Sequence, residues 1–236
     1  MNATLVFIPC HMGSATVFKD QIANFENHYP IYVADTFSHQ SISDMAKTAL
    51  DAVSGAIIPI GLSMGGYVAM EMNYQAAHRL SGLVIMDSNP YAESEQRRNE
   101  RLAEHDLIHR GRYTGMTRAG VKRMISRTSM ENTDLVDQII AMAKAPGQAI
   151  YEAQMRAIIE RRDYVATIKT CPCSALILYG AEDQVTPPEY HHDMSHMFPS
   201  SQLIEIPDAG HLISMEKPDE VNHHLQEYLE GIKYPE

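Results

Sequence analysis

Ser63 is the residue of this sequence with the clearest chemical signal. It stands in the segment GLSMGG (residues 61–66), between an apolar run and a helical pattern. A G-x-S-x-G turn between a strand and a helix is typical of nucleophilic serines, because glycines two residues before and after let strand and helix approach closely. The turn also directs the amide of Met64 toward a reacting carbonyl, and a helix N-terminus favours the negative charge that develops there. We therefore predict that Ser63 is a nucleophile.

A nucleophilic serine needs a general base, and the base needs an acid that orients it. Asp183 follows one late apolar run and His211 follows the next, so both are expected on loops at the same rim as Ser63. The chain order Ser, Asp, His is the order found in hydrolases with this turn. We predict His211 as the base and Asp183 as the acid, with Glu182 and Asp208 as rivals. The alternatives are an ordinary N-cap role for Asp183 and a hydrogen-bonded loop position for His211.

The loop after the first apolar run, PCHMGS (residues 9–14), is expected to complete the site. An oxyanion needs a second backbone donor besides the amide of Met64, and by position the amide of His11 is the best candidate. A competing interpretation gives chemistry to the side chain of Cys10 or His11, but a role in lining the pocket is favoured. We expect Cys10, Met12 and Leu212 to contact the substrate.

The elements that must position these residues alternate regularly. Six short apolar runs are typical of buried strands: 4–8, 31–34, 56–60, 83–86, 175–179 and 203–206. Amphipathic stretches of helical length separate or follow them: 15–28, 41–54, 64–78, 187–197 and 217–230. This alternation predicts an α/β fold with a doubly wound, mostly parallel sheet of about six strands. Pro59 lacks a ladder donor and favours a bulge in the strand that leads to Ser63.

One interval interrupts the alternation. Residues 88–169 carry no convincing strand and instead show helical patterns at 93–109, 118–127, 133–143 and 148–161. We predict a core formed by residues 1–87 and 170–236, with residues 88–169 inserted as a helical cap over the carboxyl ends of the strands, where such sheets bind ligands. A helical layer on the side of the sheet is the alternative.

Composition narrows the classes of partner. The 236 residues carry 30 acidic and 19 basic side chains, a formal net charge of −11. This balance disfavours nucleic acid and anionic membranes, which both require a basic surface. No apolar run reaches the roughly 20 residues of a membrane span, and the N-terminus lacks the basic region of a signal peptide. Three cysteines suit a reducing compartment, so we expect a cytoplasmic protein. Separately, we expect a monomer or small homo-oligomer.

Other polar clusters are given structural roles. His191, His192 and His196 share a predicted helix, and the pattern favours a solvated face over a metal site. His223 and His224 receive the same interpretation. The C-x-C pair in residues 171–173 has no companion pair and is interpreted as structural. We therefore expect no metal ligands and no cofactor.

Three segments together resemble the α/β-hydrolase superfamily: GLSMGG, GAEDQVTP and DAGHLISMEKPDEV, in this order. They are most similar to its small lid-bearing esterases and enol-lactonase-like members. The resemblance implies the nucleophile, base, acid and oxyanion amides named above. It departs from the family where His-Gly is replaced by Pro9 and Cys10. The chain also begins at what would be the third of eight strands, so the N-terminal hairpin is expected to be missing.

These observations together predict a cofactor-free serine hydrolase. The expected substrate is a small molecule, namely a carboxylic ester, thioester or lactone, cleaved through an acyl-enzyme. Two alternatives share the fold: a lyase or C–C bond hydrolase in which His211 acts mainly as a base, and a ligand-binding receptor with low turnover.

Overall fold

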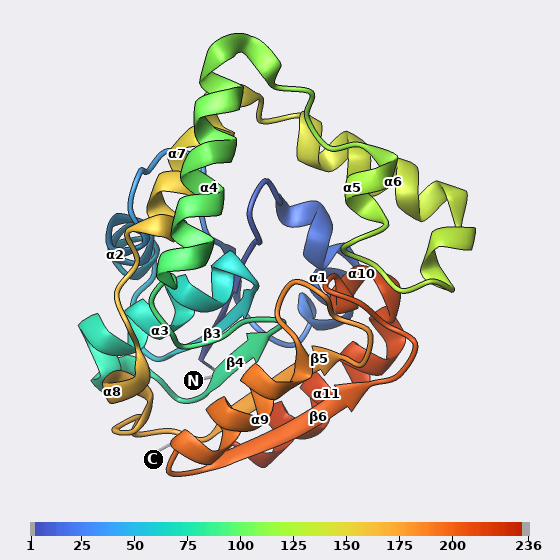
Figure 1. The fold of residues 1–236 in the computed structure, drawn as a ribbon. Coiled ribbons are helices and arrows are strands. Elements are labelled where there is room, and N and C mark those ends of the chain that lie inside the picture. The colour runs from blue at the N-terminus through green and yellow to red at the C-terminus, as the bar shows by residue number, and fades with distance from the viewer. Residues whose placement is uncertain (1–2, 233–236) are drawn as a thin grey trace.

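The computed structural model describes residues 3–232 and contains one parallel sheet flanked by helices (Figure 1). The order across the sheet is β2-β1-β3-β4-β5-β6, and every pairing is parallel. The strands are β1 (Thr4–Ile8), β2 (Ile31–Val33), β3 (Ile57–Leu62), β4 (Leu83–Met86), β5 (Ala175–Gly180) and β6 (Ser201–Ile206). The predicted six-stranded parallel sheet is therefore confirmed.

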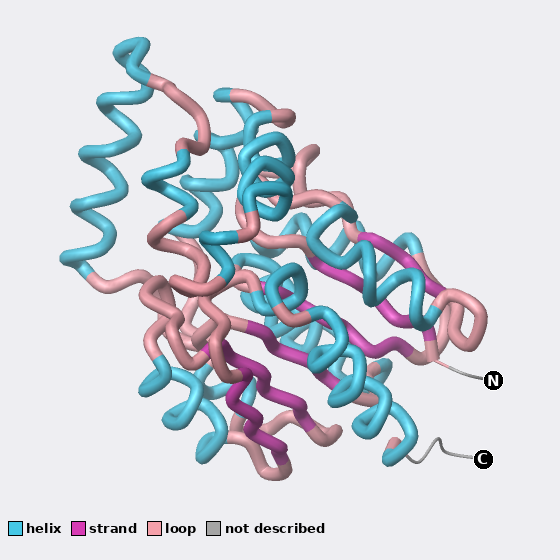
Figure 2. Tube along the Cα trace, turned by 90° about the vertical axis from the view of Figure 1, so that its right-hand side faces the viewer, coloured by secondary structure: helices cyan, strands magenta, loops and turns pink. Residues whose placement is uncertain are grey.

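Helices cover both faces of this sheet, as Figure 2 shows from the side. The α-helices of the described residues are α1 (Lys19–Phe25), α2 (Ile42–Ala52), α3 (Met64–Ala76), α4 (Glu95–Leu107), α5 (Arg118–Val121), α6 (Thr133–Lys144), α7 (Gln148–Ile159), α8 (Val165–Ile168), α9 (Pro188–Met197), α10 (Ile213–Glu216) and α11 (Pro218–Gly231). Alternate strand residues face opposite layers: Val6 packs with α2 and α3, whereas Leu5 packs with α1 and α11. Strands buried on both sides need continuous apolar runs, which explains the sequence pattern.

Pro59 lies in β3, and the bulge predicted at this proline is absent from the β1–β3 pairing. The register between β1 and β3 is continuous, and Pro59 pairs with Val6. The amide of Thr4 donates to the carbonyl of Ala56, and backbone polar groups alternate in direction along a strand. The backbone nitrogen of Pro59 therefore faces β4 rather than β1. Pairing of β3 with β4 begins one residue later, at Ile60, so the missing donor of Pro59 falls just outside that ladder.

Between β4 and β5 the chain forms α4 to α8, and α4 to α7 lie over one end of the strands in Figure 1. The prediction of a helix at 118–127 is wrong beyond the first turn, because α5 ends at Val121. The amides of Ser126 and Arg127 donate instead to the carboxylates of Glu216 and Glu182. Contacts with the core therefore replace helical hydrogen bonds. Within residues 3–232, no helix has both the length and the apolar character to span a membrane.

Candidate active site

Ser63 occupies a tight turn between the end of β3 and the start of α3. Its φ of 55° is unusual for a residue with a side chain, and its amide donates to the carbonyl of Met86 at 2.9 Å. A Cβ on Gly61 would overlap the backbone of Gly65, and one on Gly65 would overlap the carbonyl of Ile8. The glycines are therefore required because backbone segments pass against one another at this turn.

His211 lies on the loop after β6, and its Nε2 is 2.8 Å from the Ser63 Oγ. The ring is almost completely buried. Two contacts hold this loop: the His211 amide donates to the carbonyl of Met124 at 2.5 Å, and the Gly210 amide donates to Glu216 at 3.0 Å. The imidazole is thus positioned by the core and by the helical insertion together.

Asp183 lies on the loop after β5, and its Oδ2 is 2.8 Å from Nδ1 of His211. The hydroxyl of Thr186 donates to the same oxygen at 2.6 Å, while the amides of Val185 and Thr186 donate to Oδ1. Burial alone would raise the pKa of Asp183, but the charge and hydrogen bond of His211, with the bonds from Thr186, hold it below the ordinary value. The carboxylate is therefore stabilised in its ionised form.

The rival acids do not occupy this position. Glu182 accepts the amide of Arg127, and Asp208 is exposed at a positive φ of 51°. The structure thus brings Ser63, His211 and Asp183 into one hydrogen-bonded chain.

Asp87 is a second buried acid that the sequence analysis did not single out. It follows β4 directly, with Oδ1 accepting the Gly180 amide at 2.9 Å and Oδ2 near the Ile213 amide at 3.4 Å. Burial, and then the negative charge of Asp183, raise the pKa of Asp87 well above its usual range. Its signal was available, since it follows a buried strand just as Asp183 does. Asp87 therefore connects the end of β5, which leads to Asp183, with the start of α10, which follows His211.

The loop after β1 is held from the helical insertion. Met12 has a positive φ of 58°, and its amide donates to Oε1 of Gln154 at 2.8 Å. The Nε2 of Gln154, which is completely buried on α7, donates to the carbonyl of Thr36 at 2.9 Å. No local pattern marks Gln154, because its partners are more than 100 residues away in the chain.

The side chains of Cys10 and His11 are poorly suited to chemistry of their own. Burial raises the pKa of the Cys10 thiol to about 12, so the nucleophilic thiolate is scarce at neutral pH. Burial, and then the positive charge of Arg101, lower the pKa of His11 to about 4. A neutral imidazole that rests 4.8 Å from the ring of Tyr151 fits a lining role.

A cavity of about 950 Å³ opens beside Ser63 and His211 and is lined by both the core and the helical insertion. This volume is near the upper end for small-molecule sites. Cys10 and Met12 line it, as expected of substrate-contacting residues. Leu212 is not among its lining residues; its side chain is buried in the apolar core on the α11 side of the sheet.

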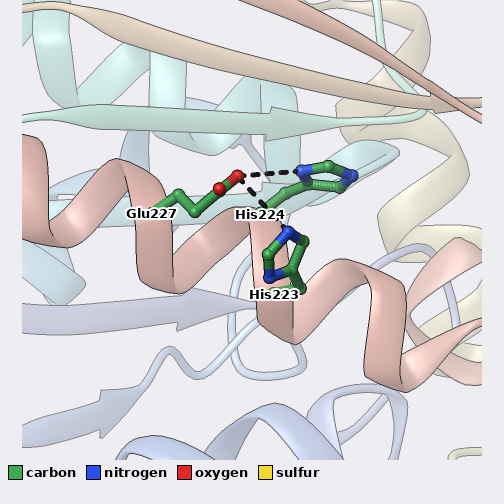
Figure 3. Close-up of side chains that lie close together, drawn as sticks. All are labelled: His223, His224 and Glu227. Carbon is green, nitrogen blue, oxygen red and sulfur yellow. Dashed lines mark ion pairs between the residues drawn. The ribbon is translucent and has the colours of Figure 1, made fainter.

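Two groups of side chains bring three metal-ligating atoms together within the described residues. Figure 3 shows His223, His224 and Glu227 on α11, where both rings approach the same carboxylate oxygen, at 3.6 and 3.5 Å. This is an ion-pair arrangement on a single helix. The other group is Asp87, Asp183 and His191, in which Asp183 is already bonded to His211.

His191 corrects the prediction of a solvated histidine face on α9. Its side chain is buried and stacks on Tyr179, with ring centroids 4.8 Å apart, whereas His192 and His196 are exposed. Burial lowers the pKa of His191 to about 4, so its ring is neutral.

Comparison with known proteins places this geometry in a family. The sequence profile of the alpha/beta hydrolase family matches residues 5–224. The chain belongs to this family. The predicted resemblance to the α/β-hydrolase superfamily is thereby confirmed, and the six-stranded sheet is this hydrolase's version of the fold.

Among the relatives of this alpha/beta hydrolase is a Mycobacterium tuberculosis protein named as the non-heme bromoperoxidase BpoC. It is 27% identical over 186 residues, which cover 74% of this chain and 68% of the relative. A thermophilic esterase from Thermogutta terrifontis, solved with malate bound, superposes with a TM-score of 0.89 at 24% identity, covering 99% of this chain and 92% of that one. The enol-lactonase from Burkholderia xenovorans superposes with a TM-score of 0.81 at 15% identity, covering 98% and 92%. The two structural likenesses show a shared fold.

Proposed function

We propose that this alpha/beta hydrolase is a serine hydrolase that cleaves a carboxylic ester, thioester or lactone through an acyl-enzyme. The supporting observation is the continuous hydrogen-bonded chain from the Ser63 hydroxyl through His211 to Asp183, with 2.8 Å at each step. The names of the esterase and enol-lactonase that share its fold agree with this class of substrate.

In the first half-reaction, Ser63 Oγ attacks the acyl carbon while Nε2 of His211 takes the hydroxyl proton. Asp183 stabilises the imidazolium that forms and keeps the ring oriented through Nδ1. His211 then gives the proton to the leaving alcohol or thiol, or to the ring oxygen of a lactone. In the second half-reaction, His211 removes a proton from water, which attacks the acyl-enzyme and releases the acid and free Ser63.

The oxyanion of each tetrahedral intermediate is assigned to the amides of Met64 and His11. Met64 is the first residue of α3, where a helix leaves its amide without an internal partner. His11 precedes Met12 in the loop that Gln154 holds against the insertion. Two fixed backbone donors of this kind stabilise developing charge without reorganisation.

Labelling and kinetics together test the proposal. We expect a fluorophosphonate to label Ser63 covalently, and a short p-nitrophenyl ester to give a burst of one product equivalent per enzyme. Ser63→Ala should abolish both while keeping the fold, and Ser54→Ala, at an exposed serine, should change neither. Turnover without label or burst would favour the lyase or C–C hydrolase alternative. Tight ligand binding without turnover would favour a receptor.

A further inference from the structure

The arginines of this hydrolase are distributed very unevenly. Eleven of its twelve arginines lie within residues 88–169, which carry 14 basic and 11 acidic side chains. The remainder of the chain carries 5 basic and 19 acidic side chains. Residues 107–130 contain six basic side chains and no acidic one. An acidic protein thus places a basic segment over the site that we propose to be catalytic.

Several of these arginines face the cavity. Five line it, against two carboxylates, Glu93 and Glu104. The lining arginines are Arg97, Arg101, Arg112, Arg123 and Arg161.

Both carboxylates are already engaged. One oxygen of Glu93 accepts from Arg101 at 2.7 Å and from Arg161 at 3.0 Å, so this cluster keeps one positive charge. Glu104 accepts the hydroxyl of Tyr151 at 2.6 Å. The cavity wall is therefore cationic.

Arg112 and Arg123 differ from the other arginines of the wall. Among the described residues, neither forms an ion pair with an acid. Arg123 precedes Met124, whose carbonyl accepts the amide of His211, so its backbone is fixed beside the reacting groups. Tyr113, next to Arg112, also lines the cavity, and its buried hydroxyl has no hydrogen-bond partner in residues 3–232. Arg112, Tyr113 and Arg123 therefore all line the cavity without an acid of the described residues paired to them.

We propose that this wall binds an anionic group, a carboxylate or a phosphate, that the ester substrate carries away from its scissile bond. Arg112 and Arg123 are the specific ligands, and the hydroxyl of Tyr113 is a further donor. The guanidinium group matches carboxylate and phosphate oxygens with paired donors, and a cationic cavity concentrates anions. The inference rests on the proposed function, because it assigns the substrate class of the same site.

Matched esters test it. Hydrolysis of monomethyl adipate and of methyl hexanoate, which differ by a terminal carboxylate, is followed by pH-stat. We expect kcat/KM to be at least about tenfold higher for the anionic ester, and the preference to shrink in 0.5 M NaCl. Arg123→Gln and Arg112→Gln should each remove most of that preference through KM and leave methyl hexanoate within about twofold. Arg110→Gln, an exposed arginine that does not line the cavity, is the control.

Inhibition identifies the source of the anion. Competition of methyl hexanoate turnover by adipate indicates a carboxylate, and competition by inorganic phosphate indicates a phosphate. Equal kcat/KM for the two esters without competition by either anion would overturn the inference. Failure of the proposed function is distinguishable, because methyl hexanoate and the fluorophosphonate would then both be inert.

Discussion

Gln154 offers the sharpest test of how the helical insertion positions the site. It is the completely buried side chain of α7 that accepts the amide of Met12 and donates to the carbonyl of Thr36, at 2.8 and 2.9 Å. Gln154→Met keeps nearly the same shape and removes both hydrogen bonds. The variant leaves one backbone donor and one backbone acceptor buried without partners.

The magnitude follows from those two groups. Each unpaired buried group costs about 1–3 kcal/mol, so we expect the free energy of unfolding to fall by about 2–6 kcal/mol. For a chain of this length, each kcal/mol lowers the Tm by about 2–4 °C, so the Tm should fall by at least about 4 °C. Met12 also loses the contact that holds its positive φ, so we expect the adjacent His11 amide to shift from its proposed oxyanion position. Removal of one such donor lowers kcat by about 10²-fold or more.

Thermal unfolding and p-nitrophenyl ester kinetics measure the two effects separately, at a temperature well below both Tm values. Gln138→Met, at an exposed position on α6, is the matched control and should change neither quantity. A Gln154→Met variant with the parental Tm would refute the estimate of two buried, unpaired groups. A lowered Tm with unchanged kcat would refute the proposal that Gln154 of α7 positions an oxyanion donor in the loop after β1.

Three further changes have defined outcomes. Asp183→Asn should lower kcat by about 10⁴-fold in steady-state assays with an intact circular dichroism spectrum, since the amide fixes the wrong imidazole tautomer; a loss below tenfold would reject the assigned acid. His191 has a pKa of about 4 in the folded protein, because of burial, against about 6.5 when unfolded. As pH falls from 6.5 to 4, the unfolded chain binds a proton at this residue before the folded protein does, so the free energy of unfolding falls by up to about 3 kcal/mol. In urea titrations at several pH values, His191→Phe should reduce this pH-dependent loss of stability. An unchanged dependence of stability on pH would contradict the burial argument. Gly65→Ala places a methyl against the carbonyl of Ile8, so it should prevent recovery of folded protein or lower the free energy of unfolding by at least about 2 kcal/mol in urea titrations. Gly231→Ala is the control: no atom of the described residues lies in reach of its Cβ, and its free energy of unfolding should stay within about 1 kcal/mol of the parent.

The sequence pattern located the sheet because its four inner strands, β1, β3, β4 and β5, are buried on both faces. The run predicted at 83–86 coincides with β4, and that at 4–8 coincides with β1. Where boundaries moved, pairing decided them: β6 begins at Ser201 rather than at Leu203, because Ser201 already pairs with Ala175 of β5. The positions of Ser63, Asp183 and His211 relative to the sheet followed from the same pattern, since the carboxyl ends of parallel strands meet at one edge.

Local sequence patterns do not show which residues far apart in the chain make contact. The polar sequence around His191 indicated a solvated helix face, yet that ring is buried and stacks on Tyr179 of β5. The helix expected at 118–127 ends at Val121, and the amide of Ser126 bonds to Glu216, 90 residues away in the chain. The cavity wall depends on the packing of α4 to α7, and no local periodicity specifies which arginines face inward.

The arrangement of two buried acids explains why charge resides where the mechanism needs it. Asp87 and Asp183 lie close enough that ionising both is unfavourable. Asp183 receives two amides, one hydroxyl and the imidazole of His211, whereas Asp87 receives only two amides, one of them at 3.4 Å. Stronger donation lowers the pKa of Asp183, and its charge in turn helps to raise that of Asp87. The ionised carboxylate is therefore the one bonded to His211, which is where the proposed mechanism requires a negative charge when the imidazole takes the proton of Ser63.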